Sequence, residues 1–233
     1  MATSAESTPQ PRTPLSRERV LNAAIRLADE GGIESLTMRK LARKLGVEAM
    51  SLYNHVANKG DLVTGIVDLV LEEIELPSAT DEWDVAIRRS AISAHETLLR
   101  HPWACSLVMS PRTFQVSGSP RVRYMESLLR RLREAGFSSD LTYHAYHALD
   151  SHIHGFTMWQ LSHMADAKRL TEDEDFADFA AALVQELRAH DFPYLAEHAE
   201  QHLAAPKDDG ARQFEFGLDL ILDGLERAAL GRA

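Results

Sequence analysis

The stretch that decides the fold is Thr37-Met-Arg-Lys-Leu-Ala-Arg-Lys-Leu-Gly-Val-Glu-Ala-Met-Ser-Leu-Tyr-Asn-His55. Apolar residues recur at helical spacing before Gly46 and again after it, which predicts two short helices joined by a turn. The outer face of the first helix is basic, with Arg39, Lys40, Arg43 and Lys44. In a helix-turn-helix, the second helix enters the major groove of DNA while the first crosses the backbone. The stretch therefore predicts a segment that binds DNA.

Further helices are predicted on both sides of this pair. The preceding one covers residues 16–30, with Ser16 as its N-cap and Gly31-Gly32 as its end. Its expected buried stripe is Val20, Leu21, Ala24, Ile25 and Ala28. Within the pair, the helices begin after Thr37 and at about Ala49, and the second continues to His55 with Leu52 and Val56 buried. The following helix starts after Asn58, carries Asp61 in its first turn and runs until Pro77.

The run from Leu15 to Leu62 resembles the DNA-binding domain of the TetR family of transcriptional regulators. The resemblance rests on the stretch Leu-Thr-x-Arg-x-Leu-Ala-x-x-Leu-Gly-Val and on Leu-Tyr-x-His-x-x-x-Lys directly after it. A C-terminal run, Phe214-Glu-Phe-Gly-Leu-Asp-Leu-Ile-Leu-Asp-Gly-Leu-Glu, resembles the last helix of the tetracycline-repressor branch. The resemblance implies an all-α protein, with a three-helix DNA-binding domain followed by a helical bundle that binds ligand and dimerises.

The same resemblance implies a set of DNA contacts. Thr37 and Lys59 are expected to bind phosphates at helix N-termini, and Tyr53 and His55 to contact the backbone. Arg39 is expected to reach a base edge. The complete expected DNA-binding set is Thr37, Arg39, Ala49, Met50, Ser51, Tyr53, Asn54, His55 and Lys59. Because residues 49–51 are Ala, Met and Ser, we expect little base-specific readout from that helix, with Asn54 able to pair with adenine.

Charge divides the chain in the same way. The 233 residues carry a formal net charge of −10. Residues 12–59 hold nine Arg and Lys against five Asp and Glu, a net charge of +4, which leaves −14 for the rest. A basic segment beside an acidic one indicates that one end meets a polyanion. We expect a disordered tail at 1–14, a helix-turn-helix domain at 15–60, and a ligand-binding and dimerisation domain at 61–233.

The composition excludes several other classes of protein. A single cysteine, Cys105, excludes an intrachain disulfide and a cluster of zinc thiolates. No apolar run reaches the length of about 20 residues that a membrane span needs, and the N-terminus lacks the apolar core of a signal peptide. We therefore expect a cytoplasmic protein that does not bind a membrane.

The acidic part is predicted to be a helical bundle. Helices are expected at about 82–100, 102–110, 120–135, 139–167, 173–190 and 213–230, with loops at 111–120 and 204–210. In the final helix, Gly217 and Gly224 lie on one side and would let another helix approach closely. The resemblance implies that this helix and the helix at 139–167 form a four-helix bundle with a second copy, making a homodimer. Packing within one chain is the alternative.

The helix at 139–167 is rich in histidine. His147, Asp150 and His154 are three and four residues apart, so they share one face. Such a face is compatible with the core edge or interface of a dimer helix, with polar contacts in a ligand pocket, or with a divalent metal ion. The residues expected to bind a ligand are Trp103, Met109, Phe114, Tyr143, His147, Asp150, His154, Met158 and Trp159. The negative charge of this part favours neutral or cationic ligands.

Together these patterns predict a transcriptional regulator, not an enzyme, without cofactor or bound metal. We expect a repressor that a small-molecule effector releases from a palindromic operator in double-stranded DNA. Two alternatives remain open at this point. One is a metal-dependent hydrolase that uses His147, Asp150 and His154, and the other is an architectural DNA-binding protein without an effector.

Overall fold

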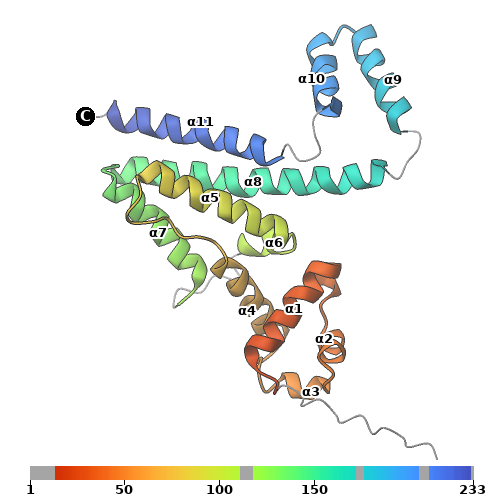
Figure 1. Cartoon of the computed structure of the whole chain (residues 1–233), viewed down its shortest axis with the longest axis vertical. Helices are drawn as coiled ribbons and strands as arrows, with labels where there is room; N and C mark the ends of the chain where they lie inside the picture. The colour runs from red at the N-terminus through yellow and green to blue at the C-terminus, as the bar shows by residue number, and fades with distance from the viewer. Residues whose placement is uncertain (1–13, 111–117, 172–175, 205–209, 232–233) are drawn as a thin grey trace, which may run out of the picture. The chain divides into compact units, whose positions relative to one another are not determined.

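The computed structural model describes residues 14–110, 118–171, 176–204 and 210–231, all of them helical or in connections between helices, without a strand (Figure 1). The expected tail at 1–14 lies almost wholly outside these residues. The chain divides into two compact units between Leu69 and Val70. We call the unit that ends at Leu69 the head and the unit that begins at Val70 the body. The division falls within one helix, α4, and the boundary expected at 60/61 lies near the start of that helix.

The head begins with α1 (Arg17–Gly31), whose limits and inward face agree with the prediction. The Ser16 hydroxyl accepts a hydrogen bond of 3.2 Å from the backbone amide of Arg19, and Gly32 ends the helix with φ = 74°. A 3₁₀ turn, η1 (Ile33–Ser35), leads to α2 (Met38–Leu45). The predicted buried stripe of α1 is confirmed and consists of Val20, Leu21, Ala24, Ile25 and Ala28.

The second helix of the motif is shorter than predicted. It is α3 (Ala49–Leu52), whereas the sequence pattern extended it to His55. The chain tightens after Leu52, because the amide of His55 bonds to the carbonyl of Leu52 at 2.9 Å, three residues back instead of four. The His55 carbonyl in turn accepts a hydrogen bond of 2.8 Å from the Arg17 guanidinium of α1.

The next helix, α4 (Lys59–Glu72), also ends earlier than the predicted limit at Pro77. Carboxylates gather where it ends, and negative charge opposes the negative end of the helix dipole. These carboxylates form ion pairs within the body instead. Glu72 pairs with Arg123 at 3.0 Å, and Glu73 pairs with Arg100 at 2.8 Å. The ion pairs connect the end of α4 to the two helices that carry these arginines.

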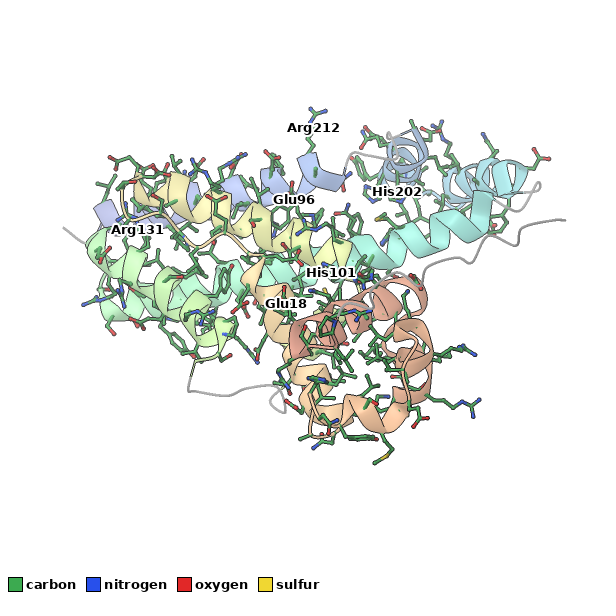
Figure 2. All side chains as sticks on the ribbon, turned by 60° about the horizontal axis from the view of Figure 1, so that its bottom comes forward. Glu18, Glu96, His101, Arg131, His202 and Arg212 are labelled. Atoms are coloured by element: carbon green, nitrogen blue, oxygen red, sulfur yellow. The ribbon has the colours of Figure 1, made fainter. Side chains whose placement is uncertain are left out.

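The body is built around its longest helix, α8 (Ser139–Thr171). In Figure 1, α11 (Gly210–Leu230) runs beside α8, and α5 (Trp83–Arg100) lies against both. The short α6 (Ala104–Val108) and α7 (Pro120–Glu134) also contact α8. Charged side chains such as Glu96 on α5 and Arg212 on α11 point outward (Figure 2).

Two further helices form a hairpin of their own. They are α9 (Phe176–Ala189) and α10 (Pro193–Ala204), which pack against each other. The sequence pattern predicted α9 but assigned no helix to residues 193–204. The signal was present, since Pro193 stands at the first helical position, where proline is favoured. Asp191 has φ = 61° and turns the chain between the two helices.

The contact between α8 and α11 uses the predicted glycine face only in part. A Cβ atom on Gly217 would lie 2.5 Å from Cε1 of His152, so Gly217 packs against α8 of the same chain. A Cβ atom on Gly224 would meet no described atom within 4 Å. Gly217 therefore allows α11 to pack closely against α8 of the same chain.

A buried histidine lies beside this contact. His95 of α5 is 2% exposed and stacks on Phe214 with ring centroids 4.0 Å apart. The hydroxyl of Thr157 donates to the carbonyl of Ile153 at 2.5 Å, so it accepts the 2.7 Å hydrogen bond from Nδ1–H of His95. Burial lowers the pKa of His95 to about 4, and the ring is neutral at physiological pH.

Candidate functional site

The helix-turn-helix geometry is set by local contacts in the head. The Thr37 hydroxyl caps α2 by accepting from the backbone amide of Lys40 at 3.2 Å. Gly46 ends α2 in the left-handed conformation with φ = 68°, which lets α3 start three residues later. Leu52 of α3 is fully buried, as predicted, and fixes the short helix to the head.

Most of the expected DNA contacts lie on the surface of the head. Met50 is 73% exposed, and Tyr53 is 45% exposed. The side chains of Thr37, Arg39, Asn54 and Lys59 are exposed as well, whereas Ala49, Ser51 and His55 are half-buried. The basic face of α2 is partly neutralised, because Lys44 pairs with Glu30 at 2.5 Å. The exposed arrangement is what a DNA-reading surface needs.

The start of α4 is held by a network around Asp61. The amide of Asp61 donates to the Asn58 side chain at 2.9 Å, and the Asp61 carboxylate accepts from the amide of Ala57 at 2.8 Å. Arg17 adds two hydrogen bonds to the same carboxylate, at 2.8 and 3.0 Å. The Arg17 side chain, followed by the Ala57 amide, lowers the pKa of Asp61 below its usual value. Lys59 is thereby presented at the first turn of a firmly capped helix.

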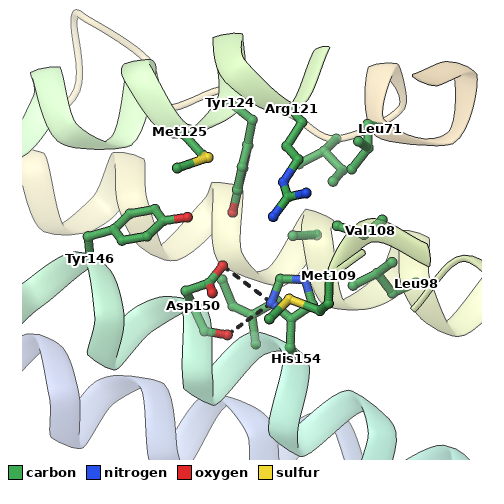
Figure 3. Close-up of a pocket in the computed structure, with 13 residues that line it drawn as sticks. Leu71, Leu98, Val108, Met109, Arg121, Tyr124, Met125, Tyr146, Asp150 and His154 are labelled. Atoms are coloured by element: carbon green, nitrogen blue, oxygen red, sulfur yellow. Dashed lines mark hydrogen bonds and ion pairs between the residues drawn. The ribbon is translucent and has the colours of Figure 1, made fainter. Parts of the chain in front are cut away.

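The body contains a small cavity between α5, α6, α7, α8 and the end of α4 (Figure 3). Its volume of about 20 Å³ is room for about one water molecule. Most of the wall is apolar, and the polar groups come from α7 and α8. The lining consists of Leu71, Ile74, Ala94, Leu98, Val108, Met109, Arg121, Tyr124, Met125, Tyr146, Asp150, Ile153 and His154.

The polar groups converge on one side of the cavity. Figure 3 shows Arg121 and Tyr124 from α7 pointing toward Asp150 and His154 on α8. Nδ1 of His154 lies 3.3 Å from the Asp150 carboxylate and 3.0 Å from its backbone carbonyl. Burial lowers the pKa of His154, but the hydrogen bond and charge of Asp150 outweigh burial and raise this pKa above its usual value. Asp150 therefore favours the protonated form of the His154 ring.

Two tyrosines face the same pair. Burial, followed by the charge of Asp150, raises the pKa of Tyr124 above its usual value. The same two causes raise the pKa of Tyr146 to about 12. Both hydroxyls therefore keep their protons. The Tyr124 side chain is 8% exposed, and its hydroxyl makes no hydrogen bond to any described residue. Ser90 lies near it and donates its own hydrogen to the carbonyl of Glu75 at 2.6 Å.

The cavity gathers three of the residues expected to bind a ligand, namely Met109, Asp150 and His154. The other described members of that set lie elsewhere. Trp103 is buried beside His101, and Tyr143 is 61% exposed with its ring 4.6 Å from that of His147. Met158 and Trp159 are exposed on α8 outside the cavity lining. Phe114 lies outside the described residues.

The sequence reading missed Arg121, Tyr124, Met125 and Tyr146, which also line the cavity. A signal existed for one of them. Tyr124 occupies the inward row of α7 at residues 120, 124, 128 and 132, where a hydroxyl needs a partner that an apolar row does not supply. The side chains from α7 become lining residues only because α7 packs on α8, which the pattern of either helix alone does not reveal.

The proposed metal cluster does not form in the described part of the chain. His147 is exposed and makes an edge-to-face contact with Tyr143, apart from the Asp150–His154 pair. Among the described residues no group of three His, Cys, Asp or Glu is placed to hold a metal ion. None of the described helices is long and apolar enough to cross a membrane.

Comparison with known proteins covers both units. Residues 20–66 match the family described as bacterial regulatory proteins, tetR family, and residues 76–229 match the tetracyclin repressor-like, C-terminal domain. Tetracycline repressor protein class D of Escherichia coli is 31% identical to this chain, over 91% of this chain and 89% of that one. The HTH-type transcriptional repressor DrrR1 of Streptomyces coeruleorubidus is 30% identical, over 93% and 79% respectively.

A solved structure agrees over nearly the whole chain. ActR of Streptomyces coelicolor, in complex with actinorhodin, has a TM-score of 0.73 and 27% identity, covering 94% of this chain and 99% of its own. The matched families decide between a regulator and a metal-dependent hydrolase in favour of the regulator. This chain belongs to the tetR family of bacterial regulatory proteins: it is a ligand-responsive, DNA-binding transcriptional repressor, not an enzyme, with a tetracycline repressor-like C-terminal domain.

Proposed function

We propose that this repressor acts as a homodimer that leaves a pseudo-palindromic operator when a small-molecule effector enters the body. The observation that carries the proposal is the course of α4. This helix begins at Lys59, beside the DNA-reading surface, and places Leu71 in the wall of the cavity. A change in the cavity that moves Leu71 is passed along one continuous helix.

The head supplies the DNA contacts. We assign DNA binding to residues 15–60, through the nine residues that the family resemblance implies, and ligand binding and dimerisation to 61–233. One head buries too little surface to specify a site alone, so two are required, with half-sites about 34–36 Å apart or at a multiple of that distance. Because its target is DNA, we expect the protein to work in the cytoplasm.

Exposed apolar side chains support dimerisation through α8 and α11. On α11, Phe216, Leu220 and Gly224 are four residues apart and share one face, and the first two are exposed. On α8, Met158 and Trp159 are exposed as well. Apolar faces of this kind are typical of surfaces that a second chain covers.

The size of the cavity supports release by opening. Sites for drug-sized molecules have volumes of about 300–1,000 Å³, far above the 20 Å³ present here. An effector of that size must therefore displace the walls, which include Leu71 and Ile74. ActR has been solved in complexes with actinorhodin and with (S)-DNPA. These complexes of a similar protein support a small-molecule effector for the present chain.

The test begins by selecting binding sites from random double-stranded DNA. We expect an inverted repeat bound by two chains. Small molecules that raise the Tm of the protein are then titrated with and without the selected operator. By thermodynamic reciprocity, an effector that weakens operator binding tenfold must itself bind tenfold more weakly to the operator complex. A selected site without symmetry would refute the dimeric operator, and a ligand indifferent to operator would refute the coupling.

A further inference from the structure

We infer that the effector is an apolar molecule carrying an anionic oxygen, which it presents to three converging donors, Arg121, Tyr124 and His154. This inference rests on the proposed effector site and names the chemistry that the site selects.

The carboxylate of Asp150 is the one strong acceptor among the described lining side chains, and His154 already lies against it at 3.3 Å. Nδ1 of His154 is engaged there, and Asp150 favours the protonated ring, whose Nε2–H is a further donor. The Arg121 guanidinium also lines the cavity, carries only N–H donors, and donates to the carbonyl of Ser110 at 3.4 Å. What the lining offers a ligand is therefore mainly donors.

The Tyr124 hydroxyl gives the strongest indication that a ligand atom binds in this cavity. Leaving a buried hydroxyl without a hydrogen bond is costly, and such groups in folded proteins call for an explanation. This one is buried, has no hydrogen bond to a described residue, and points into the cavity (Figure 3). A ligand oxygen at this position would accept a hydrogen bond from the Tyr124 hydroxyl and supply the missing partner.

The charge of the lining favours an anion. Asp150 is the one carboxylate in the described lining, and it faces the Arg121 guanidinium and the ring of His154, whose pKa it raises. The expectation of neutral or cationic ligands, drawn from the net negative charge of this part of the chain, therefore does not describe the cavity itself. The acidic residues at the end of α4 instead form ion pairs on the surface of the body.

The remaining walls determine the rest of the ligand. Leu71, Leu98, Val108 and Ile153 are buried apolar side chains that would contact a hydrocarbon or aromatic ring system. The flexible side chains of Met109 and Met125 also line the cavity, and methionine adapts readily to a change of shape. A cavity with such walls can open around a flat apolar molecule while its donors hold the oxygen.

The test uses three naphthalenes that differ only in their substituent: 2-naphthoate, naphthalene-2-carboxamide and 2-(aminomethyl)naphthalene, an anion, a neutral amide and a cation. Binding to the full-length protein is measured by isothermal titration calorimetry at pH 7.5. We expect 2-naphthoate to bind at least tenfold more tightly than the cation, with the amide between them. Hydrogen bonds from charged or polar donors to an anion are strong enough to produce a difference of this size.

Two variants examine the donors. Tyr124→Phe removes one hydroxyl and retains the ring, and Arg121→Met removes the guanidinium. Each is expected to weaken 2-naphthoate binding roughly tenfold. The controls are Arg130→Met, on the exposed side of α7, and Tyr194→Phe, on the exposed side of α10. Both controls are expected to bind 2-naphthoate as the unmodified protein does.

The outcomes distinguish a failure of the proposed effector site from a failure of the donor assignment. If no naphthalene binds at millimolar concentration, the effector site itself is wrong. If the cation binds as tightly as the anion, or if Tyr124→Phe binds 2-naphthoate normally, the site stands and the donor assignment is overturned. Tyr124→Phe decides the matter even if Arg121→Met does not fold, because it removes a single oxygen atom from the core.

Discussion

The contact of Gly217 with His152 leads to a quantitative prediction for Gly217→Ala. The new Cβ would lie 2.5 Å from Cε1 of His152, against about 3.5–4.0 Å for a normal carbon contact, so the ring must retreat by about 1 Å. Nε2 of His152 lies 2.9 Å from the carbonyl of Phe214, and the two rings stack at 4.8 Å. Losing the hydrogen bond costs about 0.5–1.5 kcal/mol, and losing the stacking costs about as much again.

The matched variant is Gly224→Ala, because a Cβ atom there meets no described atom within 4 Å. Both variants gain about 1 kcal/mol from replacing glycine in a helix interior, so the gain cancels in the comparison. We expect the free energy of unfolding of Gly217→Ala to be lower than that of Gly224→Ala by about 1–3 kcal/mol. The measurement is urea unfolding at one fixed protein concentration, since the stability of a dimer depends on concentration.

Equal free energies of unfolding for the two alanine variants would refute the packing argument at Gly217. The larger variant Gly224→Leu then tests the dimer separately. It leaves the contact with His152 intact and places bulk on the exposed face of α11, so we expect weaker dimerisation by sedimentation velocity. A variant that stays dimeric at low protein concentration would remove this face from the interface.

Three other results are expected. His95 remains neutral in the folded protein down to its pKa of about 4, whereas the unfolded chain protonates it near 6.5. The contribution of His95 to the free energy of unfolding is therefore full above pH 6.5 and falls by up to about 3 kcal/mol as the pH drops to 4. His95→Gln should flatten that fall in urea unfolding. Lys59→Ala should weaken binding to all DNA sequences and reduce the salt slope by about one, whereas Arg39→Ala should relax preference at one base position by about 1–3 kcal/mol; equal losses on operator and random DNA would contradict the role of Arg39. In the absence of ligand, Tyr124→Phe should raise the free energy of unfolding by about 1 kcal/mol, because it removes an unsatisfied buried hydroxyl; a lower value would show that the hydroxyl has a partner.

Local signals account for the parts of the fold that the sequence predicted well. The caps at Ser16 and Thr37 and the glycine ends at Gly32 and Gly46 lie within a few residues of the backbone groups that they satisfy. The end of α4 at Glu72 was predicted less well, because Pro77 pointed to a later end. Only α10 was missed as a whole helix.

The cavity proposed to bind the effector was harder to predict, because its polar residues come from two helices. Asp150 and His154 are four residues apart on α8 and could be paired from their spacing. Arg121 and Tyr124 join them only through the packing of α7 on α8. His147 satisfied the same spacing rule but faces Tyr143 at the surface. Spacing identifies a shared face of a helix and leaves open what that face meets.

The ion pairs at the end of α4 have a consequence for how such a regulator can be tuned. Glu72 with Arg123 and Glu73 with Arg100 are about half exposed, so each contributes at most about 1 kcal/mol and is weakened by salt. They secure the part of α4 next to the cavity wall with contacts that cost little to break and remake. If the effector enters this cavity as proposed, exchanging one of these surface charges would reset how much effector is needed for release, while the residues proposed to bind DNA and the cavity stay unchanged. Sensitivity can then drift over evolutionary time independently of both operator and ligand.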